Sequence, residues 1–139
     1  MVAMAVLRER RPVMLAVLDD GERSALLKLS LVSRGWEVVR AHSCEQARLR
    51  ARDQHVDALL TDLVLVDGSA FGLLRSLPRQ PRVALVLSWG KQHGIRERVL
   101  ASGFDLHLAR PVTAEAIDRT LRHALTSEPC ELFRSGYGR

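Results

Sequence analysis

The sequence is poor in aromatic residues and cysteine, and it has no long apolar run. Aromatic residues make up 4% of the 139 residues, and the two cysteines, Cys44 and Cys130, fit no metal or redox spacing. The longest apolar runs, such as VMLAVL at 13–18, fall far short of the ~20 residues that span a bilayer. The N-terminus carries its charges after its apolar residues, unlike a secretory signal. We therefore expect a cytoplasmic protein with reduced cysteines and no membrane partner.

Basic residues are in excess, but they are scattered. Lys and Arg number 21 against 16 acidic residues, which gives a net charge of +5. They fall in short groups such as RERR, RLRAR and RQPR, and no segment carries a dense basic stripe with interleaved aromatics. We therefore expect no direct binding to nucleic acid.

Sequence motifs of common enzymes are also missing. We find no P-loop, no dinucleotide-binding glycine pattern, no zinc-protease helix and no serine elbow. A phosphatase of the Asp-x-Asp type does not fit, because Leu63 and Val64 follow Asp62. A flavin site would need a phosphate-cradling loop after the first strand, where this chain has acidic residues. We expect a protein that is not an enzyme.

The hydrophobic pattern alternates between strand-like and helix-like segments. Continuous apolar runs indicate parallel strands that are buried on both faces, and the segments between them have helical spacing. Strands are predicted at 13–18, 36–41, 57–61, 82–88 and 106–109. This order predicts an α/β fold with a doubly wound, five-stranded parallel sheet. The length suits one domain at 12–126, between an N-terminal extension at 1–11 and a flexible tail at 127–139.

Helical spacing and capping residues define the predicted helices. Ser43 and Gln46 form a capping box, Thr113 caps the last helix, and Gly35 is a C-terminal stop. The apolar stripes are Ala25, Leu26, Leu29 and Val32 in the first helix; Cys44, Ala47 and Ala51 in the second; Ile95 and Val99 in the fourth; and Ile117, Leu121 and Ala124 in the last.

Polar residues follow four of the five predicted strands. Asp19 and Asp20 follow the first strand, Asp62 the third, Ser88 the fourth, and Arg110 and Pro111 the fifth. Each has a simple explanation alone, such as a helix cap for Asp20. Ligands of doubly wound sheets bind at this edge, so the set together indicates a functional site.

The chemistry of this set favours phosphoryl transfer. Three crowded carboxylates repel one another unless a proton or a cation is present. Mg²⁺ suits such a site, because it takes one or two carboxylates together with water and phosphate oxygens. A carboxylate can then attack a phosphoryl group and become an aspartyl phosphate, while the metal and a fixed cation neutralise the phosphoryl oxygens.

The order of these residues resembles the receiver domain of two-component response regulators. The resemblance covers about residues 12–126, and TDLVLVDGSAFGLLRSL at 61–77 is its most specific part. It implies the flavodoxin-like (βα)5 fold with strand order 2-1-3-4-5, and a response regulator that accepts a phosphoryl group in a phosphorelay. By this resemblance, Asp62 is the phosphoacceptor; Asp19, Asp20, Asp62 and the Val64 backbone carbonyl hold Mg²⁺; Ser88 is the switch hydroxyl; and the bond before Pro111 is cis.

The sequence departs from the family pattern at signalling positions. Arg110 replaces a lysine, and it either grips the phosphoryl group or locks Asp62 in a salt bridge. Trp89 replaces a small residue, and it either lies across the site entrance or folds back over the fourth helix. His107 replaces an aromatic residue, and it is either a surface residue without a role or a pH-sensitive contact on the output face. Val66 stands where proline is common.

The resemblance also implies partners. A sensor histidine kinase or a phosphotransfer protein would supply the phosphoryl group, and a downstream protein would receive the signal. The face of the fourth helix, fifth strand and fifth helix is expected to meet targets or form a homodimer; it would include Ile95, Arg98, His107 and Arg119. The alternative is a pseudo-receiver that acts as a docking module without phosphorylation. Mg²⁺ affinity separates the two, because a site closed by Arg110 would not bind the ion.

Overall fold

The computed structural model of the chain describes residues 10–89 and 94–126. Most of the predicted N-terminal extension and all of the predicted tail, including Cys130, lie outside these residues. None of the described helices is long and apolar enough to cross a membrane. The elements are β1 (Val13–Val17), α2 (Glu22–Ser33), β2 (Glu37–Ala41), α3 (Cys44–Asp53), β3 (Ala58–Asp62), β4 (Val64–Leu65), β5 (Gly68–Ser69), α4 (Ala70–Ser76), β6 (Val83–Trp89), α5 (Ile95–Ala101), β7 (Leu106–Arg110) and α6 (Ala114–Thr126).

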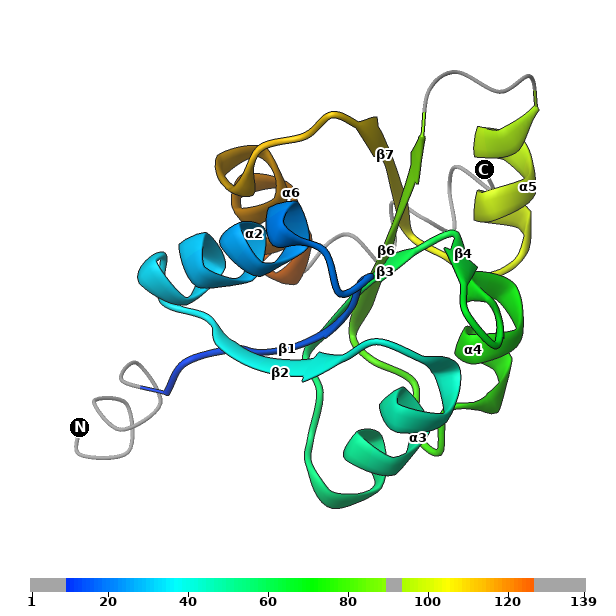
Figure 1. The fold of residues 1–139 in the computed structure, drawn as a ribbon, viewed down its shortest axis with the longest axis horizontal. Helices are drawn as coiled ribbons and strands as arrows, with labels where there is room; N and C mark the ends of the chain where they lie inside the picture. The colour runs from blue at the N-terminus through cyan, green and yellow to red at the C-terminus, as the bar shows by residue number, and fades with distance from the viewer. Residues whose placement is uncertain (1–9, 90–93, 127–139) are drawn as a thin grey trace.

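A five-stranded sheet lies between two layers of helices. Its strand order is β2-β1-β3-β6-β7, and all neighbouring strands are parallel. Helices α2 and α6 cover one face, while α3, α4 and α5 cover the other (Figure 1). This arrangement confirms the predicted doubly wound α/β fold and its strand order. The short antiparallel hairpin of β4 and β5, which follows β3, was not predicted.

Each central strand sends alternate side chains into two separate cores. In β1, Leu15 and Val17 pack with α3, α4 and α5, whereas Met14 and Ala16 pack with α2 and α6. This two-sided burial explains why the strands have continuous apolar sequences. All five residues of β3 are buried, including Asp62 at its end. A carboxylate is therefore held at the centre of the sheet edge.

The predicted helix ends agree with the structure. Gly35 follows α2 with φ of 101°, a left-handed conformation that glycine adopts most readily. The Ser43 hydroxyl accepts a hydrogen bond from the Gln46 backbone N–H at 3.1 Å. The Thr113 hydroxyl accepts one from the Ala116 backbone N–H at 3.1 Å. These caps confirm the predicted starts of α3 and α6.

The predicted apolar stripe of α2 lies on the solvent side. Leu26, Leu29 and Val32 are 59%, 62% and 43% exposed. The buried residues of α2 are instead Ser24, Leu27 and Leu31. The helix is apolar on two sides, and the side with Leu27 and Leu31 packs in the core shared with α6. The predicted buried residues of α3 and α5, and Ile117 and Leu121 of α6, are confirmed.

A buried polar cluster joins the chain after α2 to α6. The Trp36 side chain is fully buried, and its indole N–H donates to Asp118 Oδ1 at 2.8 Å. Arg122 Nε donates to the same oxygen at 2.6 Å, and its guanidinium stacks on the Trp36 ring at 5.0 Å. Burial acts to raise the pKa of Asp118, but the hydrogen bonds from Arg122 and Trp36 outweigh it and lower the pKa.

Candidate functional site

The carboxyl ends of the parallel strands bring the predicted site residues to one edge of the sheet. Asp19 lies just after β1, Asp62 ends β3, Ser88 is in β6, and Arg110 ends β7. Asp62, Ser88 and Arg110 are buried. The peptide bond between Arg110 and Pro111 is cis. A carboxylate, a hydroxyl and a cation from separate strands therefore lie at the edge where doubly wound sheets bind ligands.

Asp62 and Arg110 form a buried ion pair. Asp62 Oδ1 accepts hydrogen bonds from Arg110 Nη2 at 3.0 Å and from Nε at 3.3 Å. Each of the two residues is only 8% exposed. The other oxygen, Asp62 Oδ2, accepts one hydrogen bond, from the Asp19 backbone N–H at 3.2 Å. Arg110 therefore neutralises the Asp62 carboxylate through one oxygen, and Oδ2 has a single backbone donor among the described residues.

Trp89 lies over Arg110. The two residues are partners on the adjacent strands β6 and β7. The Arg110 guanidinium carbon is 5.1 Å from the centre of a Trp89 ring, within the range of a cation–π contact. Trp89 is 55% exposed, so its ring forms the outer side of this contact. The guanidinium is thus held by the Asp62 carboxylate and by the indole, which keeps the ion pair in place.

Asp19 and Asp20 differ in their surroundings. Asp19 Oδ1 accepts hydrogen bonds from the Gly21 backbone N–H at 2.7 Å and from the Ser24 hydroxyl at 2.9 Å. The Gly21 hydrogen bond is the main cause that lowers the pKa of Asp19. Asp20 is exposed and makes no hydrogen bond or ion pair with any residue in the described ranges. The sequence analysis did not include Ser24, although a serine on a buried helix face was a usable signal.

The predicted three-carboxylate magnesium site is not assembled in this arrangement. Within residues 10–89 and 94–126, no three His, Cys, Asp or Glu side chains gather closely enough to hold a metal. Asp62 is paired with Arg110, while Val64 lies in the neighbouring hairpin. Asp19 Oδ2 and the Asp20 carboxylate have no hydrogen-bond donor among the described residues. Because Mg²⁺ needs only one or two carboxylates with water, these two residues fit the ion.

Ser88 is engaged with His107. The Ser88 hydroxyl and His107 Nε2 share a hydrogen bond of 2.7 Å between β6 and β7. Burial is the main cause that lowers the pKa of His107, and Arg96 lowers it further. The imidazole is therefore neutral at pH 7, and it holds the hydroxyl. His107 is therefore not a surface residue without a contact, and its role as a pH-sensitive contact on the output face stays a prediction.

His107 makes the folded state sensitive to pH. Its pKa in the folded protein lies below the ordinary value of 6.5, so the unfolded chain binds more protons between these two values. Stability is therefore expected to decrease as the pH falls through this window. Urea unfolding at pH 7.5 and 5.5 tests this, and His107→Gln should reduce the difference while the exposed His42→Gln should not. An equal pH dependence in both variants would contradict this role for His107.

The prediction that Ile95 lies on the output face is wrong. This side chain is 6% exposed and packs in the core with α3 and α4. Arg98 lies with its guanidinium 5.6 Å from the Phe71 ring centre, on the side of α5 that meets α4. The short helix α5 buries one stripe only, so Ile95 cannot be both a core residue and a surface contact. His107 and the exposed Arg119 remain available for the face.

Comparisons with known proteins agree on the fold. No family model matches the chain. It is 29% identical over 115 residues to the transcriptional regulatory protein AfsQ1 of Streptomyces coelicolor, covering 82% of this chain and 51% of that protein. It is 27% identical over 118 residues to the probable transcriptional regulatory protein TcrX of Mycobacterium tuberculosis, covering 83% and 50%. The chain thus spans about half the length of these curated relatives.

Solved structures of receiver proteins superpose on nearly the whole described domain. A response regulator receiver protein from Pseudomonas putida has a TM-score of 0.71 at 27% identity, covering 82% of this chain and 98% of that one. The chemotaxis response regulator CheY4 of Vibrio cholerae has a TM-score of 0.72 at 19% identity, covering 83% and 99%. With its sheet order, the chain has the receiver fold of response regulators, and its sequence is similar to response regulators of two-component systems.

Proposed function

We propose that this receiver accepts a phosphoryl group on Asp62 and that Arg110 is the fixed cation of the site. The observation that carries this proposal is the Arg110–Asp62 contact of 3.0 Å at the buried sheet edge. Within the described ranges, Asp62 Oδ2 accepts one hydrogen bond, from a backbone N–H, so it is the oxygen available for attack. Its attack on phosphorus forms the new P–O bond, while the bond from phosphorus to the donor's leaving group breaks.

Transfer of a phosphoryl group to Asp62 requires positive charge beside the phosphoryl oxygens. Arg110 already lies against Oδ1, so its guanidinium is preorganised to meet the oxygens of a phosphoryl group on the same carboxylate. Asp19 and Asp20 would hold Mg²⁺, which supplies positive charge against the phosphoryl oxygens. The Ser88 hydroxyl, held by His107 in this state, exchanges that partner for a phosphoryl oxygen and so links the site to the output face.

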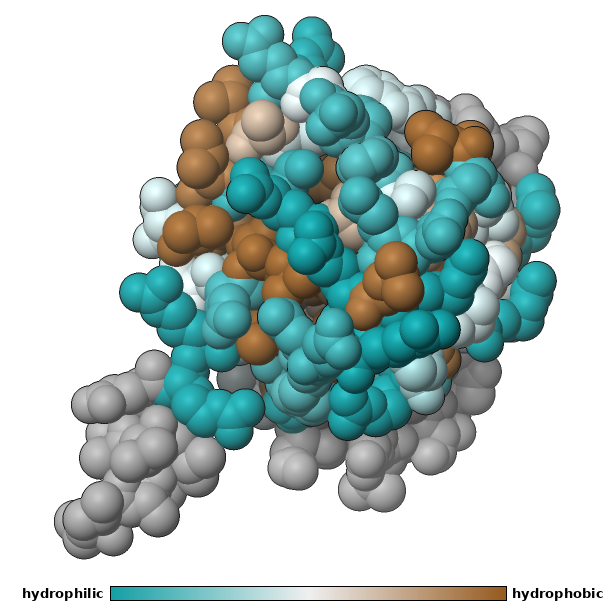
Figure 2. Space-filling model, turned by 60° about the horizontal axis from the view of Figure 1, so that its bottom comes forward, coloured by the Kyte–Doolittle hydropathy of each residue, from teal (hydrophilic) through white to brown (hydrophobic). Residues whose placement is uncertain are grey.

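The phosphodonor protein is expected to dock beside the site. A groove of about 280 Å³ lies between α2 and the start of α6, and its lining includes Leu26, Trp89, Arg110 and Pro111. It adjoins the exposed apolar residues of α2. Figure 2 shows apolar side chains gathered at the left of a largely hydrophilic face, on the side where α2 and α6 lie in Figure 1. We assign this surface to a sensor histidine kinase or a phosphotransfer protein.

A second candidate function is docking without phosphorylation. The closed state of the site favours it, because Arg110 neutralises Asp62, Trp89 covers Arg110, and Ser88 is held by His107. In that case the protein's partners recognise one fixed conformation of the receiver. The output would then be independent of both Mg²⁺ and a phosphodonor.

Incubation with Mg²⁺ and acetyl phosphate, followed by intact mass, tests the phosphorylation proposal. One phosphoryl adduct is expected in the unmodified sequence. Asp62→Asn should abolish it, because an amide oxygen cannot form a stable acyl phosphate. Asp53→Asn, a change at an exposed acid of α3, is the matched control and should keep the adduct. No adduct in the unmodified sequence would favour the docking function instead.

A further inference from the structure

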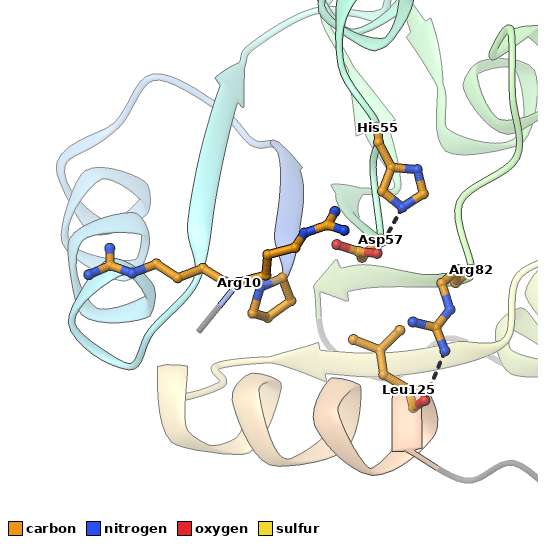
Figure 3. A pocket seen from close by; sticks show the side chains of 7 residues that line it. Arg10, His55, Asp57, Arg82 and Leu125 are labelled. Atoms are coloured by element: carbon orange, nitrogen blue, oxygen red, sulfur yellow. Dashed lines mark hydrogen bonds and ion pairs between the residues drawn. The ribbon is translucent and has the colours of Figure 1, made fainter. Parts of the chain in front are cut away.

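A second pocket lies at the opposite edge of the sheet from Asp62. Its volume is about 320 Å³. Its lining comes from the segment before β1, the turn between α3 and β3, the start of β6 and the end of α6 (Figure 3). The lining residues are Arg10, Arg11, Pro12, His55, Asp57, Arg82 and Leu125. Four separate parts of the chain thus contribute to one lining that includes three arginines, far from the phosphoacceptor.

The positive charge of this pocket is not balanced by the residues that the structure describes. Arg10 and Arg11 make no hydrogen bond or ion pair with any residue of the described ranges. Among the described lining residues, the one acidic residue is Asp57, and both of its oxygens are engaged. Oδ2 accepts the Val13 backbone N–H at 2.8 Å, and Oδ1 lies 2.9 Å from His55 Nε2. Asp57 therefore accepts a hydrogen bond from the first residue of β1 and orients His55, and it does not pair with a described arginine.

The Arg82 side chain is held by one hydrogen bond that leaves most of its N–H donors unused by the described residues. Its Nη2 donates to the Leu125 carbonyl oxygen at 3.1 Å, at the end of α6. Figure 3 shows this pair on one side of the pocket, with His55 and Asp57 across from it. An arginine has five N–H donors, and the remaining donors of Arg82 have no partner in residues 10–89 and 94–126, so they can bind a ligand. The contact with α6 fixes the guanidinium before any ligand arrives, which lowers the entropy cost of binding.

We propose that this pocket binds a small anion with a diphosphate group. Guanidinium groups recognise phosphate oxygens through paired, charge-assisted hydrogen bonds, and three of them match the charge of a diphosphate. The volume is at the small end of the roughly 300–1,000 Å³ typical of ligand pockets, which suits a compact anion. Pro12 and Leu125 supply the apolar part of the wall. The site lies apart from the phosphoacceptor and does not depend on its function.

Calorimetric titration of the full chain with inorganic pyrophosphate at low salt tests the proposal. One saturable site is expected. The double variant Arg10→Ser/Arg11→Ser should weaken binding by about tenfold or more, because each charge-assisted contact is strong. These two side chains have no hydrogen-bond or ion-pair partner among the described residues. A loss of binding in the double variant therefore cannot be attributed to the loss of a contact that stabilises the fold. Arg82→Gln should weaken binding similarly, and Arg79→Gln, an exposed neighbour outside the pocket, should leave it unchanged.

Two further titrations separate the sources of the signal. Asp62→Asn should bind pyrophosphate as the unmodified sequence does, because the phosphoacceptor lies at the other edge of the sheet. A nucleoside diphosphate that binds at least as tightly as pyrophosphate would mark the ligand as a nucleotide; weaker binding would mark it as an inorganic or smaller diphosphate. No saturable binding, or equal losses in the Arg79 and pocket variants, would overturn the proposal.

Discussion

Replacing Arg110 by alanine is expected to tighten the binding of Mg²⁺ by about tenfold or more. The guanidinium now neutralises Asp62, so the site presents two unpaired carboxylates to a cation. Removing it adds a third negative charge within a few ångströms. Between effective dielectric constants of about 80 and 20, the attraction between that charge and a divalent ion is worth roughly 2 to 7 kcal/mol at about 5 Å. The gain is electrostatic, so it should decrease as the salt concentration rises.

Titration with Mg²⁺, followed by calorimetry and by Trp89 fluorescence, measures this effect. Arg119→Ala is the matched control, because it removes an arginine from the exposed surface of α6 and should leave the affinity unchanged. The Mg²⁺ affinity of Arg110→Lys should lie between the affinities of Arg110→Ala and of the unmodified sequence, since lysine keeps the charge but not the planar fork. An affinity in Arg110→Ala equal to that of the unmodified sequence would mean that the ion pair does not compete with the metal.

Replacing Asp118 by alanine is expected to lower the free energy of unfolding by about 3 kcal/mol. The change leaves the buried Trp36 N–H without its acceptor and removes the anion between Arg122 and Arg34. These residues connect the end of α2 to α6, so the loss affects the packing of both helices on the sheet.

Urea unfolding measures this change in stability. Glu115→Ala is the matched control, because Glu115 lies one turn earlier in α6 and pairs with Arg119 at the surface. Exposed pairs of this kind contribute roughly 0 to 1 kcal/mol, so the control should be nearly neutral. A loss below about 1 kcal/mol in Asp118→Ala would show that water or a neighbouring side chain satisfies Trp36 equally well.

The fold could be predicted from the sequence because its signals are local. Continuous apolar strands, the cap at Ser43 and the left-handed Gly35 each depend on a few adjacent residues. The buried side of α2 could not be predicted, since Leu26 and Leu27 begin two apolar stripes and packing against the rest of the fold buries one of them. The Trp36–Asp118 hydrogen bond joins residues 82 positions apart, and no local pattern indicates it.

The residues of the site could be predicted from the sequence, but the contacts between their side chains could not. Parallel strands bring their carboxyl ends to one edge, so the grouping of Asp62, Ser88 and Arg110 follows from topology alone. Which partner each side chain takes depends on distances of a few tenths of an ångström. The sequence allowed two roles for Arg110, and only the structure shows that its side chain contacts Asp62. The basic pocket was missed because its arginines are scattered along the chain.

Trapping the modified residue tests the assignment of Asp62 most directly. Hydroxylamine converts an acyl phosphate into a hydroxamate and releases phosphate, and peptide mass mapping then locates the hydroxamate. After incubation with Mg²⁺ and acetyl phosphate, we expect the hydroxamate at Asp62 and at no other acidic residue. A hydroxamate at Asp19 or Asp20, or a stable phosphoryl group on Ser88 or His107 with Asp62 unmodified, would contradict the assignment.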